Sequence, residues 1–310
     1  MENLTDTPVA VTRSHRSREN RQDRRFDIIV FIIILILTIL VLYPMYFVVI
    51  ASFSDPNLVE SGQVLFLPRA VTLEGYKYIM DDHRIWTGYL NTFIYTIFGT
   101  LLAVFLTVPA AYALSRTDML GRGAIMKIFA FTMYFGGGMI PFYLLVKSLH
   151  LIDTYFVLII LGSFSTYNLI ICRTFFQTNI PHELQEAAEI DGCSIPRFFF
   201  SIVLPLSKAI IAIMVLYYAV GHWNDFFNAM IYINRDELRP LQLIMRDILI
   251  QGQSIDPSTV TDPDQIIRMQ QIGRSIKYGS IIISSLPILI FYPFVQKYFV
   301  KGVMIGSIKG

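Results

Sequence analysis

Long stretches without a charged side chain are the feature that most limits what this chain can fold into. Windows 28–54 and 85–115 hold 27 and 31 uncharged residues, and windows 128–146, 154–172 and 278–296 hold 19 each. At about 1.5 Å of rise per residue, roughly 20 helical residues cross the hydrocarbon core of a bilayer. Each window therefore predicts a transmembrane helix.

A sixth window, 209–233, is interrupted by one charged residue, Asp225. Only 15% of the 310 residues are charged and 54% are hydrophobic, whereas a soluble domain is about one quarter charged. Eleven of the charged residues also crowd into positions 1–27, so the remainder is still more apolar. We predict an all-α membrane protein with six transmembrane helices, which excludes most soluble enzyme classes.

The first window could instead be a secretory signal. The apolar core of such a signal has about 7–15 residues and precedes a small-residue cleavage site. This window is roughly twice as long, and no clear site of that kind follows it. We therefore expect a basic tail at 1–26 and a retained first transmembrane helix at 27–54.

Lysine and arginine near the ends of the windows predict the orientation, because cytoplasmic loops carry an excess of them. The tail has six arginines between positions 13 and 25, the 116–127 loop has three basic residues, and Lys297, Lys301 and Lys309 lie near the C-terminus. Both termini are therefore expected in the cytoplasm of a multi-pass protein of the cytoplasmic membrane. The tail is expected to touch anionic lipid rather than nucleic acid.

This orientation divides the chain into segments. We expect an extracytoplasmic loop at 55–84, a core at 85–300 with a second extracytoplasmic segment at 234–275, and a C-terminal tail at 301–310. The extracytoplasmic segment could form a surface for a binding protein, or it could simply cover a partner subunit.

One cytoplasmic loop departs from the charge rule. Residues 177–204 contain four acids against one basic residue, Arg197. Pro181 suits the first turn of a helix, Gly192 can take the left-handed conformation that ends one, and Ser194 can cap the next. Residues 181–205 therefore predict a helix, a sharp turn and a second helix, with Pro205 at the entry to the fifth span.

The first helix of this loop would place Leu184, Ala187, Ala188 and Asp191 on one face. The three phenylalanines at 198–200 are too apolar to remain in water and need a groove or the membrane surface. These features fit a docking element for a basic partner, and they equally fit an amphipathic loop lying on its own bundle.

The spacing of the loop resembles a known signature. Glu186-Ala187-Ala188, then Gly192, then Ile202 and Leu204-Pro205, is similar at every position to the loop of ATP-binding-cassette (ABC) importer permeases, in the carbohydrate-uptake branch. The resemblance implies a type I importer transmembrane-domain fold and a coupling helix that docks on a separate ATPase. The residues that it assigns to ATPase coupling are Glu186, Ala187, Ala188, Asp191, Gly192, Leu204 and Pro205.

The same resemblance implies the partners and the mechanism. These are a homologous permease subunit in a heterodimer, an ATPase dimer that binds ATP and magnesium, and an extracytoplasmic solute-binding lipoprotein. The expected activity is import of a carbohydrate, such as an oligosaccharide, by alternating access. Residues 223–226 resemble the family's fifth-span motif, and residues 134–141 and 301–310 resemble the subgroup that handles complex oligosaccharides and polysaccharide fragments.

Candidate residues for the substrate pathway are Trp223, Asn224, Asp225 and Asn91. An ionisable group inside a span is costly, so Asp225 should face protein or a water-filled path. Beside Trp223 and Asn224 it offers hydrogen bonding and an aromatic face to a sugar. A structural role remains open for Asp225, and Asn91 could equally join two helices.

The third span contains three consecutive glycines, 136–138, followed by Pro141. This composition should loosen the helix, and the loosened segment could line a cavity or a gate.

Other chemistry is absent from the sequence. No phosphate-binding loop motif occurs, so ATP hydrolysis is expected in a partner and not in this chain. The five histidines are scattered and the two cysteines, Cys172 and Cys193, have no metal-ligand spacing, so neither a cofactor nor a metal is expected in this chain.

Three rival functions remain open. An ion-coupled carrier would need more buried ionisable groups and an internal repeat. An importer permease for another solute would fit the loop equally well, and a non-transporting scaffold would not need the loop at all.

Overall fold

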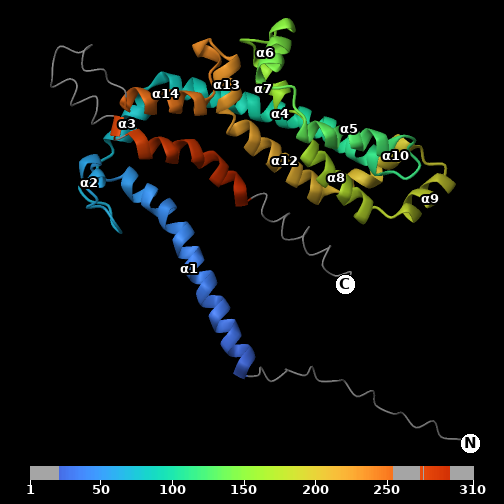
Figure 1. The fold of residues 1–310 in the computed structure, drawn as a ribbon, viewed down its shortest axis with the longest axis horizontal. Coiled ribbons are helices and arrows are strands. Elements are labelled where there is room, and N and C mark those ends of the chain that lie inside the picture. The colour runs from blue at the N-terminus through green and yellow to red at the C-terminus, as the bar shows by residue number, and fades with distance from the viewer. Residues whose placement is uncertain (1–20, 254–272, 275, 294–310) are drawn as a thin grey trace, which may run out of the picture. The chain divides into compact units, whose positions relative to one another are not determined.

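The computed structural model describes residues 21–253, 273–274 and 276–293, and the regular secondary structure in these ranges is helical. The chain divides into two compact units, Met1–Val49 and Ile50–Gly310, which are described separately. Residues 1–20 of the expected tail 1–26, residues 294–300 of the expected core, part of the segment 234–275 and the whole tail 301–310 lie outside the described residues. The ranges and the helices are drawn in Figure 1.

The described part of the first unit belongs to α1 (Arg21–Ser52), a helix with one internal proline, Pro44. Its large apolar side chains are exposed; Leu40, for example, is 66% exposed. A 29-residue stretch of this helix, Arg24–Ser52, is long and apolar enough to cross a membrane, which agrees with the expected first span.

The second unit is a helical assembly whose elements are short apart from α4. They are α2 (Pro56–Glu60), α3 (Glu74–Asp81), α4 (His83–Ser115), α5 (Arg122–Tyr134), α6 (Met139–Ser148), α7 (Tyr155–Leu161), α8 (Thr166–Asn179), α9 (His182–Ile190), α10 (Ile195–Phe198), a π-helical turn (Phe199–Val203), α11 (Leu204–Leu206), α12 (Lys208–Trp223), α13 (Phe226–Tyr232), a 3₁₀ turn (Asp236–Leu238), α14 (Leu241–Gln253) and a final helix whose continuous part is Ile276–Pro293.

Three of the expected spans are single helices, and the other three are bent pairs. The segments Arg24–Ser52 of α1, α4 and Ile276–Pro293 are each long and apolar enough to cross a bilayer. The pairs α5–α6 and α7–α8 are bent by 113° and 49°, and Ile195–Leu206 and α12 are bent by 80°. Six spans result if each pair counts as one, so the predicted number is compatible with the structure.

The expectation of continuous helices over 128–146, 154–172 and 209–233 is wrong. The glycine-rich segment ends the first of these, since Gly138 has φ +84° and precedes α6. Gly162 and Ser165 bound the break between α7 and α8, and α8 continues to Asn179 beyond the expected end. In the window 209–233, helix α12 ends at Trp223, so Asp225 lies in the break before α13 and not within a helix.

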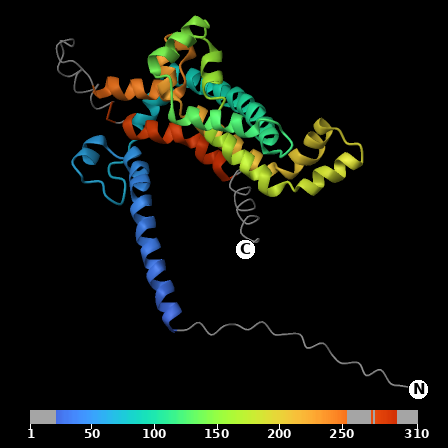
Figure 2. The same ribbon diagram turned by 45° about the vertical axis from the view of Figure 1, so that its right-hand side comes forward.

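The long helix α4 is the centre of the second unit and packs mainly against α12 and α8. Tyr218 of α12 joins these parts: its hydroxyl lies 2.6 Å from Thr107 Oγ1 of α4 and accepts the Ser165 N–H that precedes α8. Figures 1 and 2 show α9 and α10 at one end of α4, and α14 at the other. The acidic loop and the segment that begins at 234 therefore lie at opposite ends of this unit.

Candidate functional site

The loop 181–205 folds as a helix, a glycine turn and a second, short helix, as expected. Helix α9 follows Pro181, and Gly192 has φ +73° directly after it, a conformation that glycine adopts without steric cost. Ser194 precedes α10, but its side chain makes no capping hydrogen bond. Leu204 and Pro205 belong to the short helix α11 that leads to α12.

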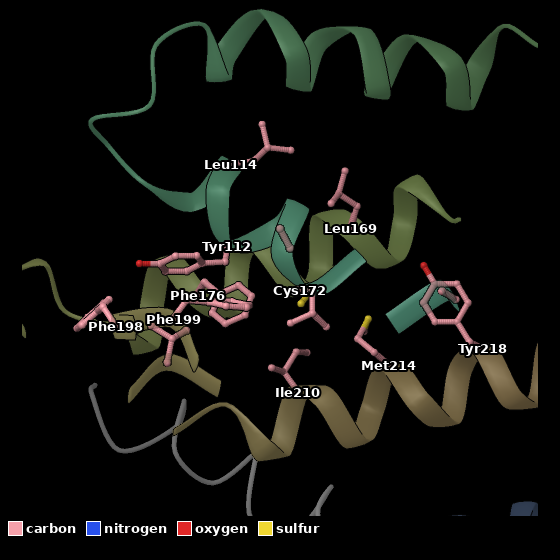
Figure 3. Packing of buried hydrophobic residues seen from close by; sticks show 14 of the residues in the cluster. Tyr112, Leu114, Leu169, Cys172, Phe176, Phe198, Phe199, Ile210, Met214 and Tyr218 are labelled. Carbon is pink, nitrogen blue, oxygen red and sulfur yellow. The ribbon is translucent and has the colours of Figure 1, made fainter. Parts of the chain in front are cut away.

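Two of the three phenylalanines anchor this loop in the protein's own core. Phe198 and Phe199 are buried in a cluster with Tyr112 of α4 and Phe176 of α8 (Figure 3). The ring of Tyr112 lies 5.0 Å from that of Phe199 and 5.7 Å from that of Phe176. Phe200 alone of the three is exposed, and for Phe198 and Phe199 the covering surface is provided by the protein's own helices.

The first helix presents two different faces. Leu184 and Ala188 pack against the same core cluster, whereas Ala187 and Asp191, which share the expected face, are exposed. We call the exposed residues Glu183, Glu186, Ala187, Ile190 and Asp191 the docking face. Ile190 is 86% exposed and lies among these acids.

The spacing of the loop did not single out Ile190 as part of this face. The sequence signal for its exposure was its position directly before the Asp191-Gly192 turn, at the end of the helix.

An arginine at the end of α4 links that helix to the loop. Arg116 donates from Nε and Nη2 to the Asp118 carboxylate, at 2.9 and 2.6 Å, and its Nη2 lies 3.7 Å from Glu189 Oε1 of α9. The Arg116 guanidinium lowers the pKa of the Asp118 carboxyl, so this pair persists at neutral pH and is lost as the pH falls through the lowered pKa. From the sequence, Arg116 was only an orientation signal.

At the other candidate site, Trp223 is buried between helices. Its indole N–H donates to the Ser284 carbonyl at 2.9 Å, and its ring lies 5.3 Å from Phe93 of α4. It lines an apolar cavity of about 580 Å³ between α4, α12 and the final helix. The Trp223 side chain therefore offers a ring edge to this cavity, while its polar atom is bonded to protein.

Asn224 and Asp225 occupy the break between α12 and α13. Asp225 caps α13: its Oδ1 accepts the Asn228 backbone N–H and its Oδ2 accepts the Asn228 side-chain amide. Asn224 is exposed and its Oδ1 lies 3.3 Å from Gln242 Nε2. Gln242, Arg246 and Phe226 line a neighbouring cavity of about 490 Å³.

Asn91 lies within α4 and is almost fully buried. Its Nδ2 donates to the carbonyls of Glu237 and Arg239, at 2.7 and 3.1 Å, and its Oδ1 accepts from the Tyr155 hydroxyl. These bonds join α4 to the segment before α14 and to α7. Trp223, Asn224 and Asp225 are consecutive residues at the end of α12, and Asn91 lies apart from them in a packing contact between helices.

Within the described part of the chain, no cluster of three or more histidine, cysteine, aspartate or glutamate side chains could hold a metal ion. The candidate features are an acidic, partly exposed loop at one end of α4 and polar side chains near the other.

Comparison with known proteins decides the family. No family model matches the chain. Protein LplC of Bacillus subtilis is 38% identical over 296 residues, which cover 96% of this chain and 99% of that protein. The polygalacturonan/rhamnogalacturonan transport system permease protein YtcP of the same organism is 40% identical over 272 residues, covering 86% and 92%. The chain belongs to the carbohydrate ABC transporter permeases.

A solved structure supports the same fold for this permease. The crystal structure of a bacterial ABC transporter involved in the import of the acidic polysaccharide alginate contains a chain with a TM-score of 0.79 and 32% identity, over 90% of this permease and 98% of that chain. Permeases of this family are membrane subunits without enzymatic activity of their own, and they act with an ATPase and a solute-binding protein.

Proposed function

We propose that this permease imports an oligosaccharide by alternating access and receives the driving motion from a separate ATPase at the docking face. The observation that carries the proposal is the exposure of acids and Ile190 on a helix whose opposite side is fixed in the core. An exposed large apolar side chain among acids favours a protein partner over water.

The buried side chains of the loop could transmit a motion from the docking face to the rest of the protein. Leu184, Ala188, Phe198 and Phe199 belong to one packed cluster with α4, α8 and α12. Because close-packed side chains do not deform continuously, a displacement of α9 would move these helices as well. The Arg116–Glu189 contact offers a second connection, from α9 to the end of α4.

For the substrate, we propose that the carbohydrate passes the break between α12 and α13. Asn224, Gln242 and Arg246 supply hydrogen-bond donors and acceptors there, and Phe226 supplies an aromatic face. Relatives named for polygalacturonan/rhamnogalacturonan transport and for alginate import handle acidic saccharides, and Arg246 could bind a carboxylate of such a sugar. Asp225 acts here mainly as the cap that orients α13.

A homologous permease subunit and an extracytoplasmic solute-binding lipoprotein complete the proposed assembly. The apolar cavity between α4, α12 and the final helix is available to that second subunit or to lipid tails.

The test of coupling uses Glu186→Lys and Gly192→Ala in the assembled transporter. Glu186→Lys reverses a charge on the docking face, and Gly192→Ala forces a left-handed conformation that costs an L-residue roughly 1–2 kcal/mol. We expect each to lower sugar uptake and to uncouple ATP hydrolysis from binding protein, with the permease still present in the membrane.

Gly121→Ala is the matched control. Gly121 has φ +76°, and a Cβ added there would meet no atom within 4 Å, as at Gly192, but Gly121 lies outside the loop. Its replacement should leave coupling intact. Full uptake by a Glu186→Lys and Gly192→Pro double variant would refute the coupling role.

A further inference from the structure

A basic cavity lies beside the coupling loop, at the end of α4. It has a volume of about 290 Å³, and its basic lining residues are Arg116, Arg122 and His182, without an acidic residue among those that the structure describes. Tyr112, Gln177 and Gln185 add further hydrogen-bonding groups to the lining. The cavity therefore combines two arginines with several other hydrogen-bonding groups, and of its basic side chains Arg116 is paired with Asp118 and His182 with Glu186.

Arg116 retains unused donor capacity in this cavity. Its Nε and Nη2 are bonded to Asp118, but its Nη1 has no hydrogen-bond partner among the described residues, and the side chain is only 9% exposed. A guanidinium presents five N–H donors in a fixed plane, so a pair on one edge leaves the other edge available. Buried polar atoms without a partner are rare in folded proteins.

Tyr112 contributes a second buried polar atom. Its hydroxyl lies against the Arg116 guanidinium, to which it is available as a hydrogen-bond acceptor, and the residue is 6% exposed. In Figure 3 the Tyr112 hydroxyl points away from the apolar side chains that surround its ring. Tyr112 and Arg116 are one helical turn apart along the chain, and both line the cavity.

We propose that this cavity binds a phosphate group. Arginine pairs with phosphate through two parallel hydrogen bonds, and Arg116 and Arg122 line the same small volume. The cavity lies at the end of α4 that is expected on the cytoplasmic side, where anionic phospholipid headgroups and soluble phosphate compounds are both within reach. An anionic phospholipid or a soluble phosphate compound could supply the group.

An occupant would contact the loop that the ATPase is proposed to engage. Pro181, His182 and Gln185 of the loop line the cavity, and His182 Nδ1 lies 3.0 Å from Glu186 Oε1 of the docking face. A bound phosphate group would draw His182 toward itself and away from Glu186. The site itself depends only on this chain and stands apart from the proposed transport mechanism.

Two probes distinguish the sources. The full chain, in nanodiscs of phosphatidylcholine, is titrated with inorganic phosphate while the ³¹P line width of the free ion is followed. In parallel, the chain is purified from mixed phosphatidylglycerol and phosphatidylcholine, and the retained lipids are counted by native mass spectrometry.

The variants are Arg122→Gln and Tyr112→Phe, of which the second removes only a hydroxyl. The matched control is Arg84→Gln at the opposite end of α4, where Arg84 pairs with Asp82 as Arg116 does with Asp118. We expect Arg122→Gln to weaken binding of the favoured probe by about tenfold, and Tyr112→Phe by a smaller factor, with Arg84→Gln unchanged.

Broadening of the ³¹P line of inorganic phosphate in the presence of the protein identifies a soluble ligand. Selective retention of phosphatidylglycerol identifies a lipid headgroup. Either result supports the site if both cavity variants weaken the binding and Arg84→Gln does not, whereas binding that none of the variants changes overturns it. Binding of neither probe, or binding that the control and the cavity variants reduce equally, overturns it.

Discussion

At the scale of single residues, His222 shows how closely the helices approach. Its ring is buried between Gly99 of α4 and Gly162 at the end of α7, and a methyl group added at either glycine would overlap it. The two glycines therefore form the notch that lets α12 pack against the broken α7–α8 pair. This use of glycine is invisible to a hydropathy pattern, because it depends on which helices meet.

Gly99→Ala is predicted to lower the thermal stability of the purified chain in detergent, because overpacking of this kind costs about 1–3 kcal/mol. The loss should shrink in a His222→Ala background, where the ring is absent. Gly221→Ala, next to His222 but with nothing within 4 Å of the added Cβ, should not destabilise the chain. Equal melting temperatures for Gly99→Ala and the parent chain would contradict the notch.

At the scale of elements, the capping of α13 by Asp225 can be separated from contact with sugar. Asp225→Ala removes the acceptor for the Asn228 N–H and should cost about 0.5–2 kcal/mol, whereas Asp225→Asn keeps a good cap and most of the stability. Thermal unfolding of the two variants measures this difference. If the two variants have equal stability and change sugar uptake to the same extent, Asp225 acts on the substrate and not as a cap.

The sequence predicted the helices but not their breaks. Uncharged windows detect the total apolar length of a span, so α1 and α4 were located closely. They contain no information on whether that length is straight, and the bends at Phe135–Gly138, Gly162–Ser165 and Ser207 follow from local backbone geometry. Gly136–Gly138 was the one break with a compositional signal.

The candidate site was predictable in its spacing but not in its orientation. The Gly192 turn followed from the need for a left-handed residue, and α9 followed from its flanking proline and glycine. The burial of Phe198 and Phe199 was not predictable, because the residues packed around them, among them Tyr112 of α4 and Phe176 of α8, lie in distant parts of the chain. The contact between Arg116 and Glu189 was equally unpredictable, since Glu189 belongs to α9 and lies far from Arg116 along the chain.

At the scale of the whole molecule, the two native cysteines can test the orientation. Cys193 in the loop is partly exposed, whereas Cys172 is fully buried. A membrane-impermeant maleimide should label the permease in inside-out vesicles and not in right-side-out vesicles, because the loop is predicted to be cytoplasmic. Cys193→Ser should abolish the labelling, and assembly with the ATPase should slow it.

Labelling of Cys193 in sealed right-side-out vesicles would place the loop outside and would be incompatible with ATPase docking. The same outcome would reverse the predicted positions of both termini, since an even number of spans keeps them on one side.

The burial of Phe198 and Phe199 also limits how such a transporter can be re-engineered. If residues 181–205 engage the ATPase as proposed, exchanging the whole segment between permeases should disturb the fold, because the donor's side chains would have to fit against the recipient's α4 and α8. Partner choice can instead be rewritten on the outward positions, Glu183, Glu186, Ala187, Ile190 and Asp191, with the buried side chains left untouched. The outward residues of the loop can therefore change without disturbing the core, whereas its buried residues must fit against α4 and α8.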